Sequence, residues 1–140
     1  MPRGPVPEKI QEILRRPNPC VIATVALDGS LHTAATSYEW TDRATVLVNM
    51  DGSRRRLEHI RKDPRVAMTI FDGDRWSSHV SLSGHVVDIR PDPDLRDIDR
   101  IANNYSGQPY HHRDRDSWSA EIAVDRWHSW DSSTDTPITV

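Results

Sequence analysis

The fold is decided by the stretch Val46-Leu47-Val48-Asn49-Met50-Asp51-Gly52-Ser53-Arg54-Arg55-Arg56-Leu57-Glu58-His59-Ile60-Arg61-Lys62-Asp63-Pro64. The apolar run at residues 45–48 is typical of a short strand, and Asp51-Gly52 is a turn dipeptide. Residues 57–61 then follow a helical spacing that Pro64 stops. The stretch therefore predicts a strand, a tight turn and a helix, with three arginines at the helix N-terminus.

The three arginines Arg54, Arg55 and Arg56 lie where an anion is favoured. Free backbone N–H groups and the positive end of the helix dipole attract an anion there, and guanidinium groups add paired hydrogen bonds to phosphate oxygens. A basic run on a small domain is most often a solvated face, but such a face belongs at a helix C-terminus. The position of this run favours a site for a phosphate-bearing ligand.

The length of the chain, 140 residues, suits a single domain. We expect this domain to span residues 1–130, with residues 131–140 as a flexible C-terminal tail. The mean hydropathy is −0.68 and there is one phenylalanine, so the apolar core must be thin. A thin core fits a small barrel or a core completed by a second subunit, and we therefore expect a homodimer.

The overall charge argues against two classes of partner. A net charge of −3 and a pI of about 6.1 should not draw the protein to nucleic acid or to an anionic membrane. No apolar run is long enough to span a bilayer and no secretory signal is evident, so we expect a cytoplasmic protein. Lys9 and Lys62 are the only lysines among 18 basic residues, which leaves 16 arginines and suggests a GC-rich, actinobacterial-like coding sequence.

Alternating apolar residues and turn signals predict a mainly β (α+β) fold. Five or six antiparallel strands with short flanking helices indicate a closed or half-closed barrel, and we expect six strands. The sequence argues against a doubly wound dinucleotide fold, because no strand is followed by G-x-G-x-x-G. The expected strands are residues 20–26, 31–40, 45–50, 65–71, 76–89 and 118–130, with Gly84 at a bulge or bend; the expected helices are residues 7–16, the segment before Pro64, and 92–106 with Asp92 as N-cap and Gly107 at the end.

Other possible sites carry less weight. The single cysteine, Cys20, excludes an intramolecular disulfide and is expected in the core. Seven histidines do not predict a metal site, because His111 and His112 are adjacent and adjacent residues on an extended chain point apart. His85 could face a ligand, although a hydrogen-bonded structural role is the simpler expectation. No nucleophile elbow, P-loop or triad spacing is present.

The order of these motifs resembles the pyridoxamine 5'-phosphate oxidase-like split β-barrels, of the FMN-binding split-barrel type. Within them it looks most like the flavin/deazaflavin oxidoreductases of the B group, which typically bind coenzyme F420. The similarity covers nearly the whole chain, and its residues are Ala23-Thr24-Val25 with Asp28-Gly29, Val46-Leu47-Val48-Asn49, Arg55-Arg56, Arg61-Lys62-Asp63-Pro64-Arg65-Val66, Ser83-Gly84-His85-Val86, and Val124-Asp125-Arg126-Trp127-His128-Ser129-Trp130.

This resemblance implies a homodimer with the cofactor at the subunit interface. It implies an oxidoreductase that moves a hydride between F420 and a small planar or conjugated acceptor, with no catalytic side chain identified because the cofactor carries the chemistry. By position, Asn49 and Met50 would line the cofactor, Arg54, Arg55 and Arg56 would hold its phosphate, and Trp76 and Ser78 would approach from neighbouring strands.

Departures from the family pattern leave alternatives open. Arg56 stands where lysine is usual, Ala35 where proline is common, and Glu58 could weaken binding of a polyglutamyl tail. An FMN-binding oxidase or reductase is therefore the second hypothesis. A non-catalytic barrel that binds F420 or haem is the third, and a nucleic-acid binder is a distant fourth.

Overall fold

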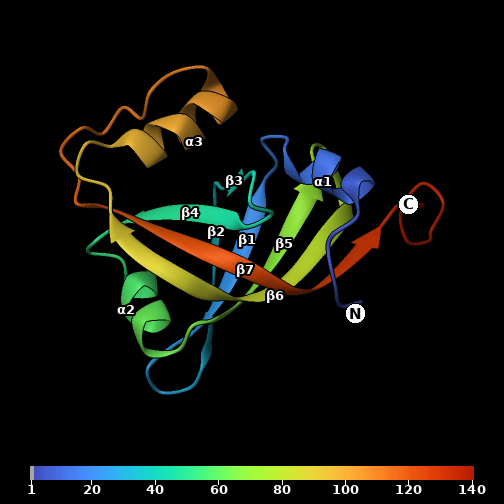
Figure 1. The fold of residues 1–140 in the computed structure, drawn as a ribbon, viewed down its shortest axis with the longest axis horizontal. Coiled ribbons are helices and arrows are strands. Elements are labelled where there is room, and N and C mark those ends of the chain that lie inside the picture. The colour runs from blue at the N-terminus through green and yellow to red at the C-terminus, as the bar shows by residue number, and fades with distance from the viewer. Residues whose placement is uncertain (1) are drawn as a thin grey trace.

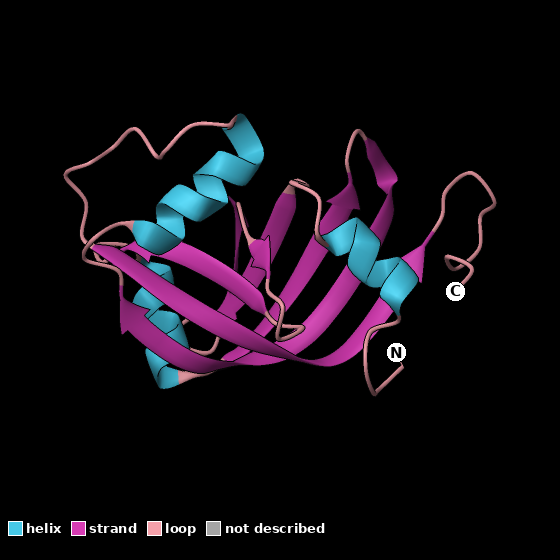
Figure 2. Cartoon of the chain, turned by 45° about the horizontal axis from the view of Figure 1, so that its top comes forward, coloured by secondary structure: helices cyan, strands magenta, loops and turns pink. Residues whose placement is uncertain are grey.

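The computed structural model describes residues 2–140, which form seven strands and three helices. The strands lie in one sheet, and the helices pack around its ends and one face (Figures 1 and 2). None of the three helices is long and apolar enough to cross a membrane. In chain order the elements are α1 (Glu8–Leu14), β1 (Cys20–Val25), β2 (Leu31–Thr36), β3 (Glu39–Trp40), β4 (Val46–Asp51), α2 (Arg55–Lys62), β5 (Arg65–Asp72), β6 (Arg75–Pro91), α3 (Arg96–Ser106) and β7 (Ser117–Trp130).

The expected mainly β, antiparallel fold is confirmed, but the expectation of six strands in a closed or half-closed barrel is corrected. The sheet has seven antiparallel strands in the open order β2-β1-β5-β6-β7-β4-β3. The strand expected at 31–40 breaks at Ser37 and Tyr38, so that β2 becomes one edge of the sheet and β3 the other. Because only two residues join these edges, the sheet must curl to bring them together, which gives a split barrel.

The break in this strand has a local cause. The side chain of Tyr38 is fully buried, and its hydroxyl donates to the carbonyl oxygen of Leu14 at 2.7 Å while accepting from Asn18 Nδ2 at 3.1 Å. These bonds tie residue 38 to the end of α1 instead of to the partner strand β1. The buried hydrogen bonds of the Tyr38 side chain are therefore favoured over continued strand pairing at this position.

The core lies inside the curled sheet and is capped by α1 and α2. Residues 46–50 of β4 are all buried, and β1 alternates between buried and half-buried positions. Cys20 is 3% exposed, which confirms that it is a core residue. Strand β6 has a register shift at Gly84, where a Cβ would clash with the carbonyl oxygen of Ala123. The expected bulge at Gly84 is confirmed, and it bends the strand as the curl requires.

Helix α3 begins later than expected. Asp92 precedes its first residue, Arg96, by one turn, and Leu95 between them has a left-handed φ of 60°. The carboxylate of Asp92 nevertheless accepts hydrogen bonds from the backbone N–H groups of Asp97 at 3.1 Å and Ile98 at 3.2 Å. Asp92 is thus a capping residue that acts from one turn before the helix, and Gly107 ends α3 at a φ of 74° as expected.

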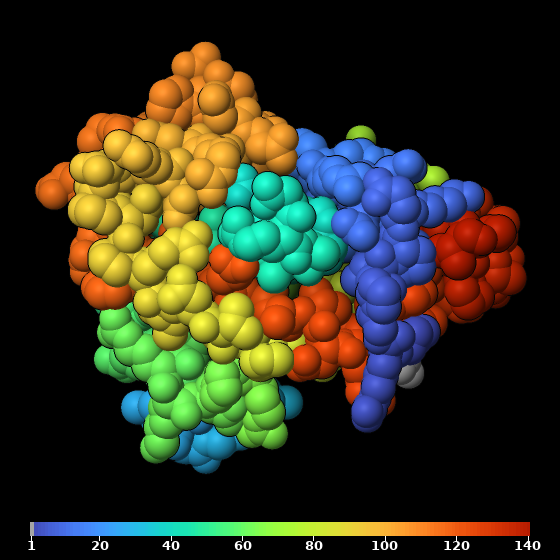
Figure 3. All heavy atoms as spheres, in the orientation of Figure 1, coloured from blue at the N-terminus to red at the C-terminus, as the bar shows by residue number. Residues whose placement is uncertain are grey.

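Both ends of the described chain lie on the same side of the molecule. The N-terminal segment, blue in Figure 3, crosses β7, and Trp127 N donates to the carbonyl oxygen of Pro2 at 3.1 Å. After β7, a bridge between Asp131 and Thr136 closes a turn, and Ile138 packs against the core. The flexibility expected for residues 131–140 concerns motion and stays a prediction.

Candidate functional site

The turn between β4 and α2 is built by Asp51. Its carbonyl oxygen accepts from Arg54 N at 3.0 Å, and its carboxylate accepts from Ser53 N at 3.1 Å and from the Ser53 hydroxyl. The Ser53 side chain and backbone lower the pKa of Asp51. Gly52 fits because a Cβ there would collide with the Asp116 carboxylate. The sequence prediction of strand, tight turn and helix is confirmed, and α2 begins at Arg55.

The side chains of the three arginines at this turn have no partner within the described residues. Among residues 2–140, eight other arginines form ion pairs, whereas the side chains of Arg54, Arg55 and Arg56 form neither an ion pair nor a hydrogen bond. Arg56 is half-buried, and desolvation together with the neighbouring Arg54 lowers its pKa. No side chain caps the first amides of α2, although Leu57 N donates to the carbonyl oxygen of Arg54 at 3.2 Å. This concentration of unpaired donors fits a phosphate group.

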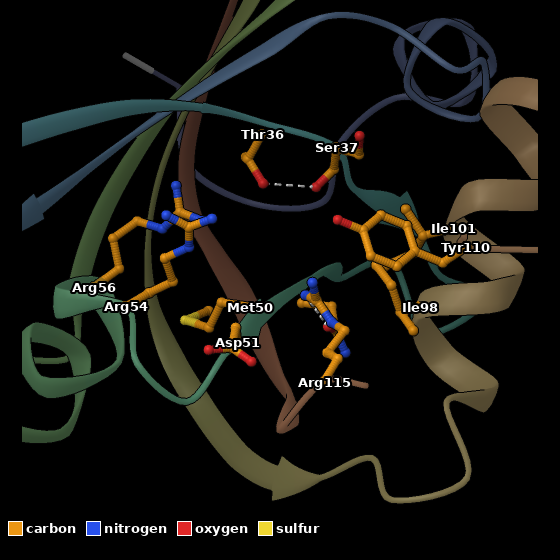
Figure 4. A pocket seen from close by; sticks show the side chains of 11 residues that line it. Thr36, Ser37, Met50, Asp51, Arg54, Arg56, Ile98, Ile101, Tyr110 and Arg115 are labelled. Atoms are coloured by element: carbon orange, nitrogen blue, oxygen red, sulfur yellow. Dashed lines mark hydrogen bonds between the residues drawn. The ribbon is translucent and has the colours of Figure 1, made fainter. Parts of the chain in front are cut away.

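A cavity of about 160 Å³ opens beside these arginines (Figure 4). Arg54 and Arg56 form one wall, and Tyr110 and Arg115 face them from the other side, with Met50 between. The same cavity is lined by Thr36, Ser37, Asn49, Asp51, Ile98 and Ile101. It therefore combines a cationic wall with an apolar and aromatic one, as planar phosphorylated ligands require.

The cavity continues as a groove between β2 and α2, which we call the β2 groove. Its inner part is the cavity just described. Its middle part, about 460 Å³, shares Arg54 and Arg56 with the inner part, and its outer part, about 560 Å³, shares His32 and Arg55 with the middle one. The remaining lining is Thr33, Ala34 and Ala35 in the middle part, and Ala26, Leu27, Asp28, Ser30, Leu31, Glu58 and His59 in the outer part.

Asn49 reaches the inner cavity, but its amide is already engaged. Its Oδ1 accepts from Arg115 Nη2 at 2.8 Å and from the Ser117 hydroxyl at 3.0 Å, while its Nδ2 donates to Ser119 Oγ at 3.0 Å and to Asp92 at 3.3 Å. The amide thus joins β4, β7 and the cap of α3. In this chain Asn49 organises the wall of the cavity, whereas Met50 contributes apolar surface.

Tyr110 and Arg115 are site residues that the sequence patterns did not single out. The guanidinium of Arg115 lies 4.8 Å from the centre of the Tyr110 ring, and Tyr110 N donates to Asp99 Oδ1 at 3.0 Å. Arg113 also binds Asp99, at 2.7 Å. These contacts hold the loop after α3 against the cavity. The available signal was a tyrosine followed by basic residues in a polar loop, which is weak without knowledge of where the loop lies.

Trp76 and Ser78 lie away from this cavity within one chain. They begin β6 beside α1, whereas the arginine turn lies at the other end of the molecule (Figure 1). Trp76 is 74% exposed, and the buried Ser78 hydroxyl is bonded to Ser132 Oγ at 2.8 Å and accepts from Arg75 at 3.3 Å. A single chain therefore brings Asn49, Met50, Arg54 and Arg56 together around one cavity with Arg55 next to them, but not Trp76 and Ser78.

The histidines form no evident metal site. The rings of His111 and His112 lie 4.1 Å apart, so the expectation that they point apart is wrong, because the loop is not extended there. No group of three or more metal-ligating side chains occurs in residues 2–140. His85 Nδ1 is 2.9 Å from Asp125 Oδ2, and His85 does not line the β2 groove.

Comparisons with known proteins agree with the overall fold. A solved structure named F420 reductase matches with a TM-score of 0.77 and 26% identity, covering 87% of this chain and 98% of that one. A conserved hypothetical protein from Mycobacterium tuberculosis shares the fold at 22% identity, with a TM-score of 0.74 over 99% of this chain and 92% of that one. General Stress Protein 26 from Bacillus anthracis shares it at 18% identity, with a TM-score of 0.67 over 95% of this chain and 97% of that one. No curated protein matches significantly. The family model for pyridoxamine 5'-phosphate oxidase matches residues 6–131, and the chain therefore belongs to that family.

Proposed function

We propose that the protein is an F420-dependent oxidoreductase that acts on a small planar or conjugated acceptor. The proposal is carried by three arginines, Arg54, Arg55 and Arg56, whose side chains have no partner in the part of the chain that the structure describes and which lie beside a cavity with an aromatic wall. The family match and the 26% identical F420 reductase support the choice of chemistry and cofactor.

The residues present fit a phosphorylated deazaflavin. Arg54, Arg55 and Arg56 hold its phosphate together with the free amides that begin α2. Met50 and Tyr110 provide surface for the ring, and the Arg115 stack on Tyr110 fixes that wall. When bound, reduced F420 supplies the hydride, while the protein orients the two reactants and excludes water.

The proposal includes a homodimer. The inner cavity, about 160 Å³, is smaller than typical ligand pockets of roughly 300 Å³ or more, so one chain offers only part of an enclosure for a tricyclic ring. Large apolar side chains remain on the surface, with Leu31 80% exposed beside the groove and Trp76 74% exposed. A second copy would cover such residues and complete the site, and Trp76 and Ser78 would then approach the cofactor from the partner.

FMN is the alternative cofactor. An arginine clamp at a helix start binds the terminal phosphate of FMN as well as the phosphate of F420, and the family match favours flavin chemistry in general. A protein that binds either cofactor without reducing any acceptor would be a carrier.

The test is a fluorescence titration of the purified protein with F420 and, separately, with FMN. It is repeated with Arg55→Ala and Arg56→Ala, and with Arg3→Ala as the control, because Arg3 lies on the N-terminal segment and lines no part of the groove. Saturable F420 binding that only the groove variants weaken supports the proposal and justifies an acceptor screen. FMN binding alone makes the protein a flavoprotein, and binding of neither refutes the site.

A further inference from the structure

The charge of the β2 groove changes sign along its length. The middle part is lined by Arg54, Arg55 and Arg56 and by no carboxylate. The inner part keeps a positive balance, with three arginines against the single carboxylate of Asp51. The outer part reverses this balance, because Arg55 there faces two carboxylates, Asp28 and Glu58.

Both carboxylates at the outer end are available to act on a ligand. The Ser30 hydroxyl and backbone N–H donate to Asp28 at 2.6 Å and 3.0 Å, and these bonds lower the pKa of Asp28 and keep it charged. Glu58 is exposed and forms no ion pair among residues 2–140. The nearby His59 is buried, and its Nδ1 is bonded to Thr24 Oγ1 at 2.9 Å.

The lining of the groove also favours one orientation of a bound cofactor along it. Met50, Ile98, Ile101 and Tyr110 are all in the inner part, which suits a planar ring. A ligand with its ring there and its phosphate on the arginines reaches the outer part if it continues along the groove, because the middle and outer parts share His32 and Arg55. The group that meets Asp28 and Glu58 is therefore whatever follows the phosphate.

Resting on the proposed function, we propose that Glu58, with Asp28, selects against acidic extensions beyond the phosphate. The chain then prefers F420 with a short polyglutamyl tail to F420 with a long one. Each added glutamate brings a carboxylate toward two others of the same sign, and salt screens this repulsion over a Debye length of about 10 Å at 0.1 M. The sequence departure at Glu58 thereby becomes a specificity determinant.

The experiment measures Kd by fluorescence for F420 with one or two glutamates and with a long tail. At low salt we expect the long form to bind the wild type roughly threefold to tenfold more weakly, with the ratio approaching one in about 0.5 M salt. Glu58→Lys should abolish or invert the ratio, and Glu58→Gln should reduce it. FMN, which ends at its phosphate, is the matched control and should change by less than about twofold in both variants.

The following outcomes would overturn the inference about Glu58, the F420 proposal or both. Equal or tighter binding of the long form by the wild type overturns the inference, as does a ratio that neither Glu58 variant changes. If FMN binds and neither form of F420 does, the F420 proposal fails, and the selection at Glu58 survives only if Glu58→Lys gains F420 binding. If no ligand binds any variant, both proposals are wrong.

Discussion

Two groups of arginines in this protein contrast in their contacts. Around α3, Arg90 binds Asp88 at 2.9 Å, Arg100 binds Glu39 at 2.5 Å, and Arg113 binds Asp99 at 2.7 Å. At the start of α2, the side chains of Arg54, Arg55 and Arg56 bind nothing within the described chain. The same side chain therefore fastens a helix in one region and remains free for a ligand in the other.

The contrast shows where the fold tolerates unfavourable electrostatics. Adjacent cations at a helix N-terminus repel one another and the helix dipole, and partial burial adds to this cost at Arg56. No carboxylate of residues 2–140 forms an ion pair with them, although 21 acidic residues are present in the chain. Selection for an anion at this turn explains such an arrangement better than selection for stability.

The largest expected effect is a loss of stability on substitution of Asp92, which supports the α3 region. Its buried carboxylate accepts hydrogen bonds from Ser117 at 3.0 Å, from Asn49, and from two backbone N–H groups of α3. Asp92→Ala should lower the free energy of unfolding by about 3 kcal/mol, because it leaves several buried donors unpaired. Chemical denaturation measures the loss. Asp92→Asn keeps an acceptor and should lose less; a loss below about 1 kcal/mol in Asp92→Ala would contradict the buried network.

The next prediction tests the arginine turn by affinity instead of stability. Arg56→Ala should weaken binding of F420 or FMN roughly 10- to 100-fold, since it removes charge-assisted hydrogen bonds to phosphate. The free energy of unfolding should stay within about 0.5 kcal/mol of the wild-type value, or rise, because repulsion is relieved. Titration and denaturation are run on the same sample. A loss of stability as large as that of Asp92→Ala would make Arg56 a structural residue.

The smallest expected effect is on how the stability of the fold depends on pH, through arginines that are ion-paired. The hydrogen bond from Arg113 holds the pKa of Asp99 below its usual range, and the hydrogen bond from Arg43 does the same for Glu121. Folded pKa values below the unfolded ones mean that both carboxylates stabilise the fold above about pH 4. This contribution, on the order of 1 kcal/mol in total, should be lost as pH falls through the folded values.

Unfolding curves at several acidic pH values check this third prediction. A double variant, Asp99→Asn with Glu121→Gln, should show a shallower decline in stability than the wild type. Identical pH slopes in the two proteins would show that these ion pairs add nothing to the stability of the fold.

Sequence reasoning found what local patterns encode. The strand, turn and helix around Arg54 follow from neighbouring residues, and so do the bulge at Gly84 and the end of α3 at Gly107. The break of the second strand at Tyr38 was missed because its cause is a contact with the distant Leu14. Tyr110 and Arg115 were missed for the same reason, since only the fold brings their loop to the cavity.

The open order of the sheet also has a consequence for how the chain folds. Strand β4 pairs on one side with the two-residue strand β3, and on the other with β7, where Val46 lies opposite Ile122. During synthesis, β4 therefore emerges long before β7, its main partner, which is the last strand of the domain. Such distant pairing gives a high contact order and predicts slow refolding, with the buried apolar face of β4 exposed to aggregation until β7 arrives.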